Sequence, residues 1–377
     1  MFKLGIDRID EFMDLFKGKK VGLITNPTGV NSNLKLTADI LFEKTNLTTL
    51  FGPEHGIRGN AEAGAHVESY FDPKLKLEVH SLYGQNRRPS ASMLKDVDVL
   101  CYDMQDVGLR FYTYIYTMAH AMNAAKDLGL KFVVFDRPNP LGSKVEGNIL
   151  DITYRSFVGY YEIPQRYGLT TGELATLFNE VFDIHCDLTV IPMLGYQRDK
   201  DFLSYNLAWL APSPNLPTLD SAFIYAATVI FEGTNISEGR GTTRPFSMIG
   251  APFIDADELA AKVNALNLEG IRIRPISFTP NMSKHQGVTC NGIEIFLTDK
   301  EKFMPVKTGF KILNVIRETY KEFTFLPPWK VGGHQMIDLL TGNSNLRLGK
   351  DLNQMFEGFK TDEINFKKMT ARFHLYE

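Results

Sequence analysis

A glutamate and a histidine stand side by side in a turn rich in glycine and proline. The segment Gly52–Gly59 reads GPEHGIRG and places Glu54 and His55 between a proline and a glycine. A carboxyl group beside an imidazole suits acid–base chemistry, and burial in a crevice would raise the carboxyl pKa toward neutrality, as a general acid requires. The alternative is a structural turn in which Glu54 caps a helix and His55 packs.

Three further turns of the first half carry polar side chains. Asn26 opens an NPTG turn, and Asp103 and Asp106 form a DxxD turn. These aspartates could orient a sugar hydroxyl, act as a second carboxylate or bind a cation, or they could only stabilise the turn through hydrogen bonds to the backbone. The last turn reads DRPNP, where Asp136 and Arg137 could form a structural ion pair.

The second half contributes one polar segment, EGTNISEGRGTTR at 232–244. It gathers potential ligand groups among glycines and threonines. This concentration favours a loop that reaches over a crevice; the alternative is a plain exposed loop. These groups are Glu232, Glu238, Arg240 and Arg244. Its glycines do not follow the Walker pattern, and no GxGxxG follows the first apolar run, so we expect no nucleotide cofactor.

Short apolar runs precede all four turns of the first half and predict the strands that must position them. The runs are Val21–Thr25, Leu47–Phe51, Val97–Tyr102 and Phe132–Phe135. A helix is predicted over Tyr112–Leu128, and this alternation indicates a parallel sheet covered on both faces. Because the carboxyl ends of parallel strands share one edge, the four turns should converge on one crevice.

The same pattern continues to about residue 205. Thr170 and Glu173 form a capping box before a helix, and Leu188–Ile191 reads as one more strand. After the rigid PSPNLP connector at 212–217 the pattern changes to helices at 221–231, from 255 and at 306–320, with strands at 271–276 and 292–297. We therefore predict an α/β protein: a Rossmann-like domain (1–205) followed by a smaller α+β domain (206–377), with the active-site cleft between them.

Composition excludes several classes of function. A net charge of −3 over 377 residues gives no general attraction to nucleic acid, and no apolar run reaches the roughly 18 residues of a membrane span. No GxSxG, HExxH or paired-cysteine zinc spacing occurs. We expect no cofactor and no metal, although His55 and the turn aspartates could form a metal site. The oligomeric state is left open.

Five segments together resemble the NamZ family of exo-acting β-N-acetylmuramidases. They are GLITNPTG at 22–29, FGPEHGIRG at 51–59, YDMQDVGLRFYTYIYTM at 102–118, FDRPNPLG at 135–142 and EGTNISEGRGTTRPF at 232–246. The resemblance implies hydrolysis of a β-linked N-acetylmuramic acid (MurNAc) at the non-reducing end of peptidoglycan fragments, in cell-wall turnover or recycling. MurNAc-containing glycan fragments are thus the expected partners. It also implies an extracytoplasmic location, with a cytoplasmic one as the alternative.

The same resemblance implies that Glu54 is the catalytic glutamate. We assign it as general acid, with His55 tuning or orienting it. The second group is Glu238, Asp106 or Asp103, in that order, or the acetamido group of the substrate itself. The lactyl carboxylate of MurNAc should be bound by a guanidinium, ideally in a bidentate pair. The candidates are Arg58 and Arg240, which we favour, and Arg110, Arg137 and Arg244.

Other side chains of these turns are predicted to bind the sugar. They are Asn26, Tyr112, Asp136, Asn139 and Glu232. The aromatic run that contains Tyr112 could stack on a sugar or form helical core. Two other functions remain open: a metal-dependent ester or phosphoester hydrolase, and a non-catalytic protein that binds cell-wall sugars.

Overall fold

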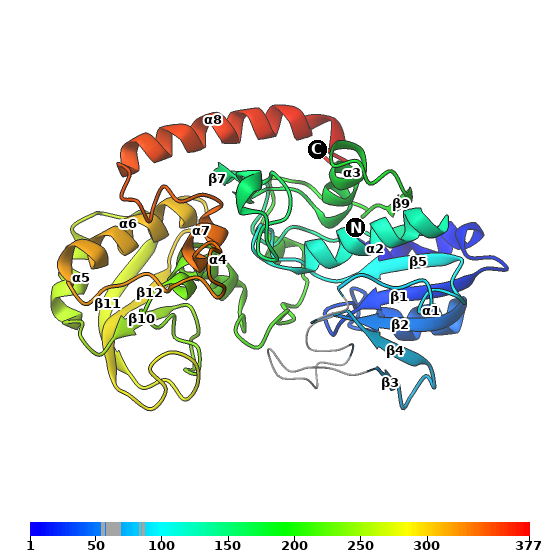
Figure 1. The fold of residues 1–377 in the computed structure, drawn as a ribbon. Helices are drawn as coiled ribbons and strands as arrows, with labels where there is room; N and C mark the ends of the chain where they lie inside the picture. Colours follow the sequence, from blue (N-terminus) through cyan, green and yellow to red (C-terminus); the bar gives the residue numbers. More distant parts are fainter. Residues whose placement is uncertain (54–56, 58–68, 83, 85–86) are drawn as a thin grey trace.

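The computed structural model describes residues 1–53, 57, 69–82, 84 and 87–377, which form two domains lying side by side (Figure 1). Glu54, His55 and Arg58 lie outside the described residues, so the roles predicted for them stay predictions. No helix in the described part of the chain is long and apolar enough to cross a lipid bilayer.

The first domain is built on a parallel sheet. Its described strands follow the order β3-β4-β2-β1-β5-β6-β9, and only β3 runs antiparallel to its neighbour. The strands are β1 (Lys20–Thr25), β2 (Asn46–Gly52), β3 (Tyr70–Phe71), β4 (Glu78–Ser81), β5 (Val99–Asp103), β6 (Lys131–Phe135) and β9 (Asp187–Ile191). The predicted α/β class is confirmed, and each of the strands predicted for this sheet is present.

Helices cover both faces of this sheet. Leu100 and Tyr102 of β5 pack in one apolar layer with α2 (Tyr114–Leu128) and α3 (Thr171–Val181). Val99 and Cys101 face the opposite layer, which contains η1 (Ile6–Leu15) and α1 (Thr37–Lys44). Burial on both faces explains why the strands read as continuous apolar runs. The predicted capping box of Thr170 and Glu173 begins α3.

The second domain carries an antiparallel sheet of order β10-β12-β11 in the described chain. Its strands are β10 (Met248–Ala251), β11 (Ile271–Phe278) and β12 (Cys290–Leu297), and its helices are α4 (Leu219–Thr228), η4 (Val229–Gly233), α5 (Ala256–Asn264), α6 (Pro305–Thr319) and α7 (Met336–Thr341). The helices and strands predicted for this half are present, and β10 and α7 were not predicted.

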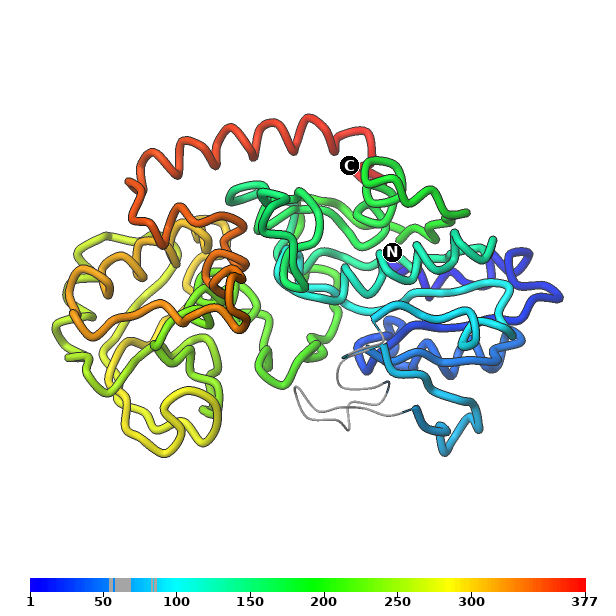
Figure 2. Tube along the Cα trace, in the orientation of Figure 1, coloured from blue at the N-terminus to red at the C-terminus, as the bar shows by residue number. Residues whose placement is uncertain are grey.

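The last helix, α8 (Leu352–Thr370), runs along both domains (Figure 1). Asp362 accepts a hydrogen bond from the backbone N–H of Ile149, in the hairpin β7 (Glu146–Ile149) and β8 (Pro164–Arg166) of the first domain. Beyond α8, the chain returns to α3 (Figure 2), where the backbone N–H of Leu375 donates to Glu173. The C-terminal residues therefore fasten the second domain to the first.

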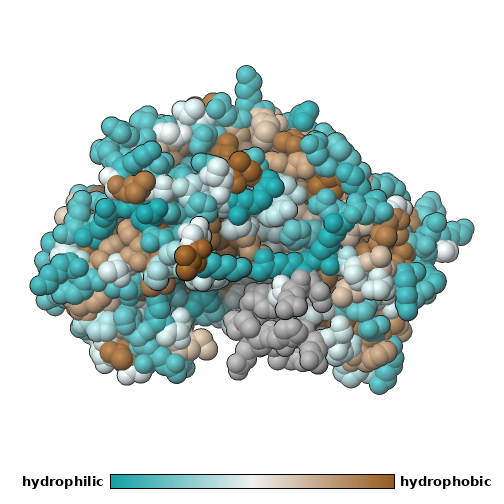
Figure 3. Space-filling model, in the orientation of Figure 1, coloured by the Kyte–Doolittle hydropathy of each residue, from teal (hydrophilic) through white to brown (hydrophobic). Residues whose placement is uncertain are grey.

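One apolar cluster extends through both domains. It includes Leu100 and Phe111 of the first domain and Tyr225, Ile249 and Phe310 of the second. The visible surface is mostly hydrophilic, with small, separate apolar patches (Figure 3). The two domains therefore meet through a packed interface. Three short 3-10 helices lie in the connections of the chain: η2 (Ile152–Tyr154), η3 (Phe202–Tyr205) and η5 (Ala371–Phe373).

Candidate active site

The turns after β1, β5 and β6 meet at one sheet edge, as the parallel sheet predicts. The backbone N–H of Gln105 donates to Thr28 Oγ1 at 2.9 Å, and Arg137 donates to the carbonyl of Val30 at 2.5 Å. A Cβ on Gly29 would lie 2.6 Å from the carbonyl oxygen of Asp103, so the turns are in close contact. A void of about 20 Å³, lined by the turns after β1, β5 and β6 and by residues 202 and 207–210, has room for a water molecule.

Asp103 and Arg137 form a buried ion pair. Arg137 Nε donates to Asp103 Oδ1 at 2.5 Å and Nη2 donates to Oδ2 at 2.9 Å, while Thr37 also donates to Oδ2. Asp103 is 0% exposed and Arg137 3%. Since both carboxylate oxygens are used inside the protein, the geometry favours the structural role over catalysis by Asp103 or substrate binding by Arg137.

Asp106 is buried next to this pair. Its Oδ2 accepts from the N–H of Gly108 at 2.6 Å and from the Tyr167 hydroxyl. Burial raises the pKa of Asp106 to about 6, and no donor among the described residues reaches Oδ1. A pKa in this range suits a general acid or base, but the carboxyl points into the domain core, and its catalytic role stays a prediction.

Three residues predicted to bind the sugar form hydrogen bonds within the protein: Asp136, Asn139 and Asn26. Asp136 accepts from the Thr170 hydroxyl at 2.9 Å and the Tyr376 hydroxyl at 2.5 Å, and burial raises its pKa to about 7. Asn26 and Asn139 each accept from the backbone N–H two residues ahead, which closes a local turn. All three are at most 5% exposed, so these contacts explain their positions without a substrate.

Arg110 and Tyr112 lie in the domain interface. Arg110 is 0% exposed, and its guanidinium donates to backbone carbonyls of both domains, those of Asn148, Ile163, Leu340 and Thr341. Tyr112 packs edge-on against Tyr114 and Tyr225, with ring centroids 4.9 and 6.2 Å away. The enclosed guanidinium joins the domains, so the geometry favours a structural role for Arg110 over the predicted substrate binding. It also favours the core interpretation of the aromatic run.

The second domain holds a charged cluster, which we define as Glu232, Glu238, Arg240 and Lys284. Arg240 Nη2 donates to Glu232 Oε1 at 2.6 Å, and its Nε lies 3.2 Å from Glu238 Oε1. Lys284 Nζ lies 2.7 Å from Glu238 Oε2. Burial raises the pKa of Glu232, and the Arg240 charge opposes that shift. Two carboxylates and two cations make the cluster internally neutral.

Aromatic rings connect the charged cluster to the sheet edge of the first domain. The Arg240 guanidinium lies 5.0 Å from the Phe246 ring centroid, and Phe246 packs edge-on against Tyr225 at 4.6 Å. Tyr225 in turn contacts Tyr112, which lies beyond the carboxyl end of β5. The cluster therefore sits at the junction of the domains, on the side that the strand ends face.

Arg244 does not join this cluster. Its Nη1 lies 2.9 Å from Glu294 Oε1, while Arg274 Nη2 lies 2.5 Å from Oε2 of the same carboxylate. Glu294 is only 2% exposed and needs these cations, since an unpaired buried carboxylate would be strongly destabilising. Arg244 is therefore held by the sheet of the second domain.

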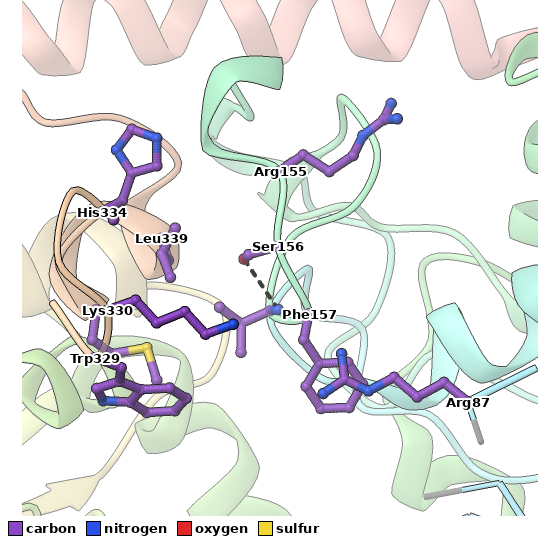
Figure 4. Close-up of a pocket in the computed structure, with 11 residues that line it drawn as sticks. Arg87, Arg155, Ser156, Phe157, Trp329, Lys330, His334 and Leu339 are labelled. Carbon is purple, nitrogen blue, oxygen red and sulfur yellow. Dashed lines mark hydrogen bonds between the residues drawn. The ribbon is translucent and has the colours of Figure 1, made fainter. Parts of the chain in front are cut away.

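A pocket of about 460 Å³ opens between the domains (Figure 4). Arg87 and the segment 155–158 line it from the first domain, and residues 329–339 line it from the second. Three of its cations are Arg87, Arg155 and Lys330. We call this space the interdomain pocket. None of its residues was predicted from the sequence, because they come from three distant segments that form no motif.

Two family models match consecutive parts of the chain: the N-terminal model of "Exo-beta-N-acetylmuramidase NamZ" over residues 21–220 and the C-terminal model over residues 223–376. The chain belongs to the NamZ family. The two matches cover almost the whole sequence, so the resemblance of the five segments is confirmed.

One relative and two solved structures match this chain over most or all of their length. The chain is 49% identical to the peptidoglycan β-N-acetylmuramidase NamZ of Bacillus subtilis (strain 168), over 99% of this chain and 91% of that protein. Crystal structures of two DUF1343 family proteins from Bacteroides fragilis superpose with TM-scores of 0.89 and 0.77, at 37% and 29% identity. Each covers all of this chain and 99% of the other.

The charged side chains of this NamZ-family site do not form a metal-binding group within the described residues. Asp103, Asp106 and Asp136 each face a different set of donors: a guanidinium, a tyrosine with a glycine N–H, and a threonine with a tyrosine. The turns therefore lie together at one sheet edge, but the carboxylates of these three aspartates do not face a common point.

Proposed function

We propose that this protein hydrolyses the glycosidic bond of a terminal β-linked MurNAc in peptidoglycan fragments and releases MurNAc. The observation that carries the proposal is the 49% identity to a peptidoglycan β-N-acetylmuramidase over 99% of the chain. The fold is consistent with it, because the GPEHG turn follows β2, a central strand whose carboxyl end belongs to the sheet edge described above.

We assign Glu54 as the general acid that protonates the leaving oxygen, with His55 as the residue that orients it. The oxocarbenium-like centre then needs a second group. The charged cluster is the best candidate source, because it brings Glu238 and Glu232 to the domain junction and keeps them beside Arg240. The acetamido group of the substrate is the alternative nucleophile.

Product analysis of a defined MurNAc–GlcNAc disaccharide tests this function. The enzyme should release free MurNAc and GlcNAc, and a chelator should not change the rate. The isomeric GlcNAc–MurNAc disaccharide, which has no MurNAc at its non-reducing end, is the matched control and should stay intact. Cleavage of the control alone, or complete loss of activity with chelator, would contradict the proposal.

The extracytoplasmic location stays a prediction from the family. It is supported by the nature of the substrate, since peptidoglycan lies outside the cytoplasmic membrane. Fractionation of cells that express the full-length gene, followed by immunoblotting, would test it, and a purely cytoplasmic signal would contradict it.

A further inference from the structure

We propose that the interdomain pocket binds the lactyl carboxylate of the terminal MurNAc, through Lys330 and Arg87, with Trp329 against the apolar face of the sugar. The proposal rests on the proposed function for the identity of the sugar. It moves carboxylate recognition from Arg240, one of the two cations that the sequence favoured, to a surface made jointly by the two domains; the other, Arg58, lies outside the described residues.

The first argument is that the cations of the interdomain pocket lack carboxylate partners among the described residues. Arg87 lies over the Phe157 ring at 3.7 Å, whereas Arg155 lies over the Tyr160 ring at 4.8 Å and extends away from Lys330 and Arg87 (Figure 4). No carboxylate of the described residues forms an ion pair with Arg87, Arg155 or Lys330. Within the described part of the chain, these guanidinium and ammonium groups therefore have no carboxylate partner, which is the state that suits an anionic ligand.

The other candidate cations differ in this respect. Arg240 already contacts two carboxylates and Arg137 one. Arg110 is enclosed by carbonyls. A lactyl carboxylate at Arg240 would have to approach Glu232 and Glu238, and like charges in a partly buried site repel strongly. Charge alone thus favours the interdomain pocket.

The second argument is the apolar lining. Trp329 is 84% exposed at the pocket, and Met336 and Leu339 line it. In Figure 4 the Lys330 side chain extends across the pocket toward Phe157, so charged and apolar groups face the same space. The lactyl and acetamido methyl groups and the sugar ring offer apolar surface that such a lining can cover. A volume of about 460 Å³ falls within the range for small-ligand sites.

The third argument is continuity with the charged cluster. Helix α7, which carries Met336 and Leu339, packs directly on η4, which carries Glu232. A Cβ on Gly233 would lie 2.5 Å from the backbone nitrogen of Ile337, so the two elements are in close contact. The interdomain pocket and the charged cluster therefore lie on adjoining elements.

Calorimetric titration with free MurNAc tests the proposal without turnover. Arg87→Gln and Lys330→Gln should each weaken MurNAc binding about tenfold, the order of magnitude of one lost charge-assisted contact. Neither should change the binding of MurNAc methyl ester, which keeps the sugar and lacks the charge. Arg272→Gln, at an exposed position of β11 outside the pocket, is the matched control and should bind like the wild type.

Equal weakening for the acid and its ester would overturn the carboxylate assignment, and so would a loss of acid binding in Arg240→Gln with none in the pocket variants. Hydrolysis of the MurNAc–GlcNAc disaccharide is scored separately. If the wild type hydrolyses the disaccharide and the pocket variants bind MurNAc as the wild type does, this site is refuted and the proposed function stands. Selective acid binding without turnover would refute the proposed function and support the site.

Discussion

Neutralising Asp103 should destabilise the fold and leave substrate affinity unchanged. Asp103→Asn keeps the shape of the side chain, so the turns after β5 and β6 can still pack. It removes the negative charge that Arg137 contacts through two nitrogens at 2.5 and 2.9 Å. Arg137 would then be a buried cation without its carboxylate, held by neutral acceptors only: the asparagine oxygen and the carbonyl of Val30.

The expected magnitude follows from burial. Because Asp103 is 0% exposed and Arg137 3%, solvent screens the pair little. Breaking a buried pair by removing one member costs about 3–5 kcal/mol, which for a domain of this size corresponds to a fall in melting temperature on the order of 10 °C. The double variant Asp103→Leu/Arg137→Met should lose less than Asp103→Asn alone, since no buried charge is left unpaired.

Thermal unfolding followed by circular dichroism gives the test, with KM for a MurNAc glycoside measured well below the transition. Asp187→Asn is the matched control: it removes an exposed partner of Lys131 at the opposite edge of the same sheet and should change the melting temperature little. A melting temperature for Asp103→Asn equal to that of the control, or a selective rise in KM without loss of stability, would refute the structural role of the pair.

Three other substitutions test separate parts of the molecule. Glu54→Gln should keep the fold and lose at least about 100-fold in kcat on a chromogenic MurNAc glycoside, as expected for a general acid; near-normal turnover would exclude that role. Burial raises the pKa of Glu146 to about 7, above its ordinary value of 4.5, so its stabilising contribution is present at acidic pH and is lost as the pH rises through 7. The melting temperature should therefore fall more between pH 5 and 8 in the wild type than in Glu146→Gln, and parallel curves would contradict this. Tyr376→Phe removes the hydroxyl that donates to Asp136 and accepts from the backbone N–H of Met193, and should cost about 1–2 kcal/mol; an unchanged free energy of unfolding would show that the C-terminal contact is not stabilising.

The elements predicted from the sequence were those with strong local signals. The runs at 21–25 and 132–135 became β1 and β6, and the capping box at Thr170 begins α3, because apolar periodicity and cap residues act within a few positions. Helix α8 was not predicted, although Asp351 caps its start and Met355, Phe356 and Phe359 fall on one buried face. It is stabilised by contacts with distant elements, such as Asp362 with the backbone of Ile149, and such contacts cannot be read from local pattern.

The sequence by itself determined the sheet, the convergence of its turns and the family, since each depends on residue types in local order. Tertiary structure decided which charged groups are already satisfied. Arg110 is enclosed by the carbonyl of Thr341, 231 positions away, and Asp103 by Arg137, 34 positions away. The cations of the interdomain pocket come from three segments that only folding brings together. Whether a charged group has a partner depends on distances in space, so the motifs could not show it.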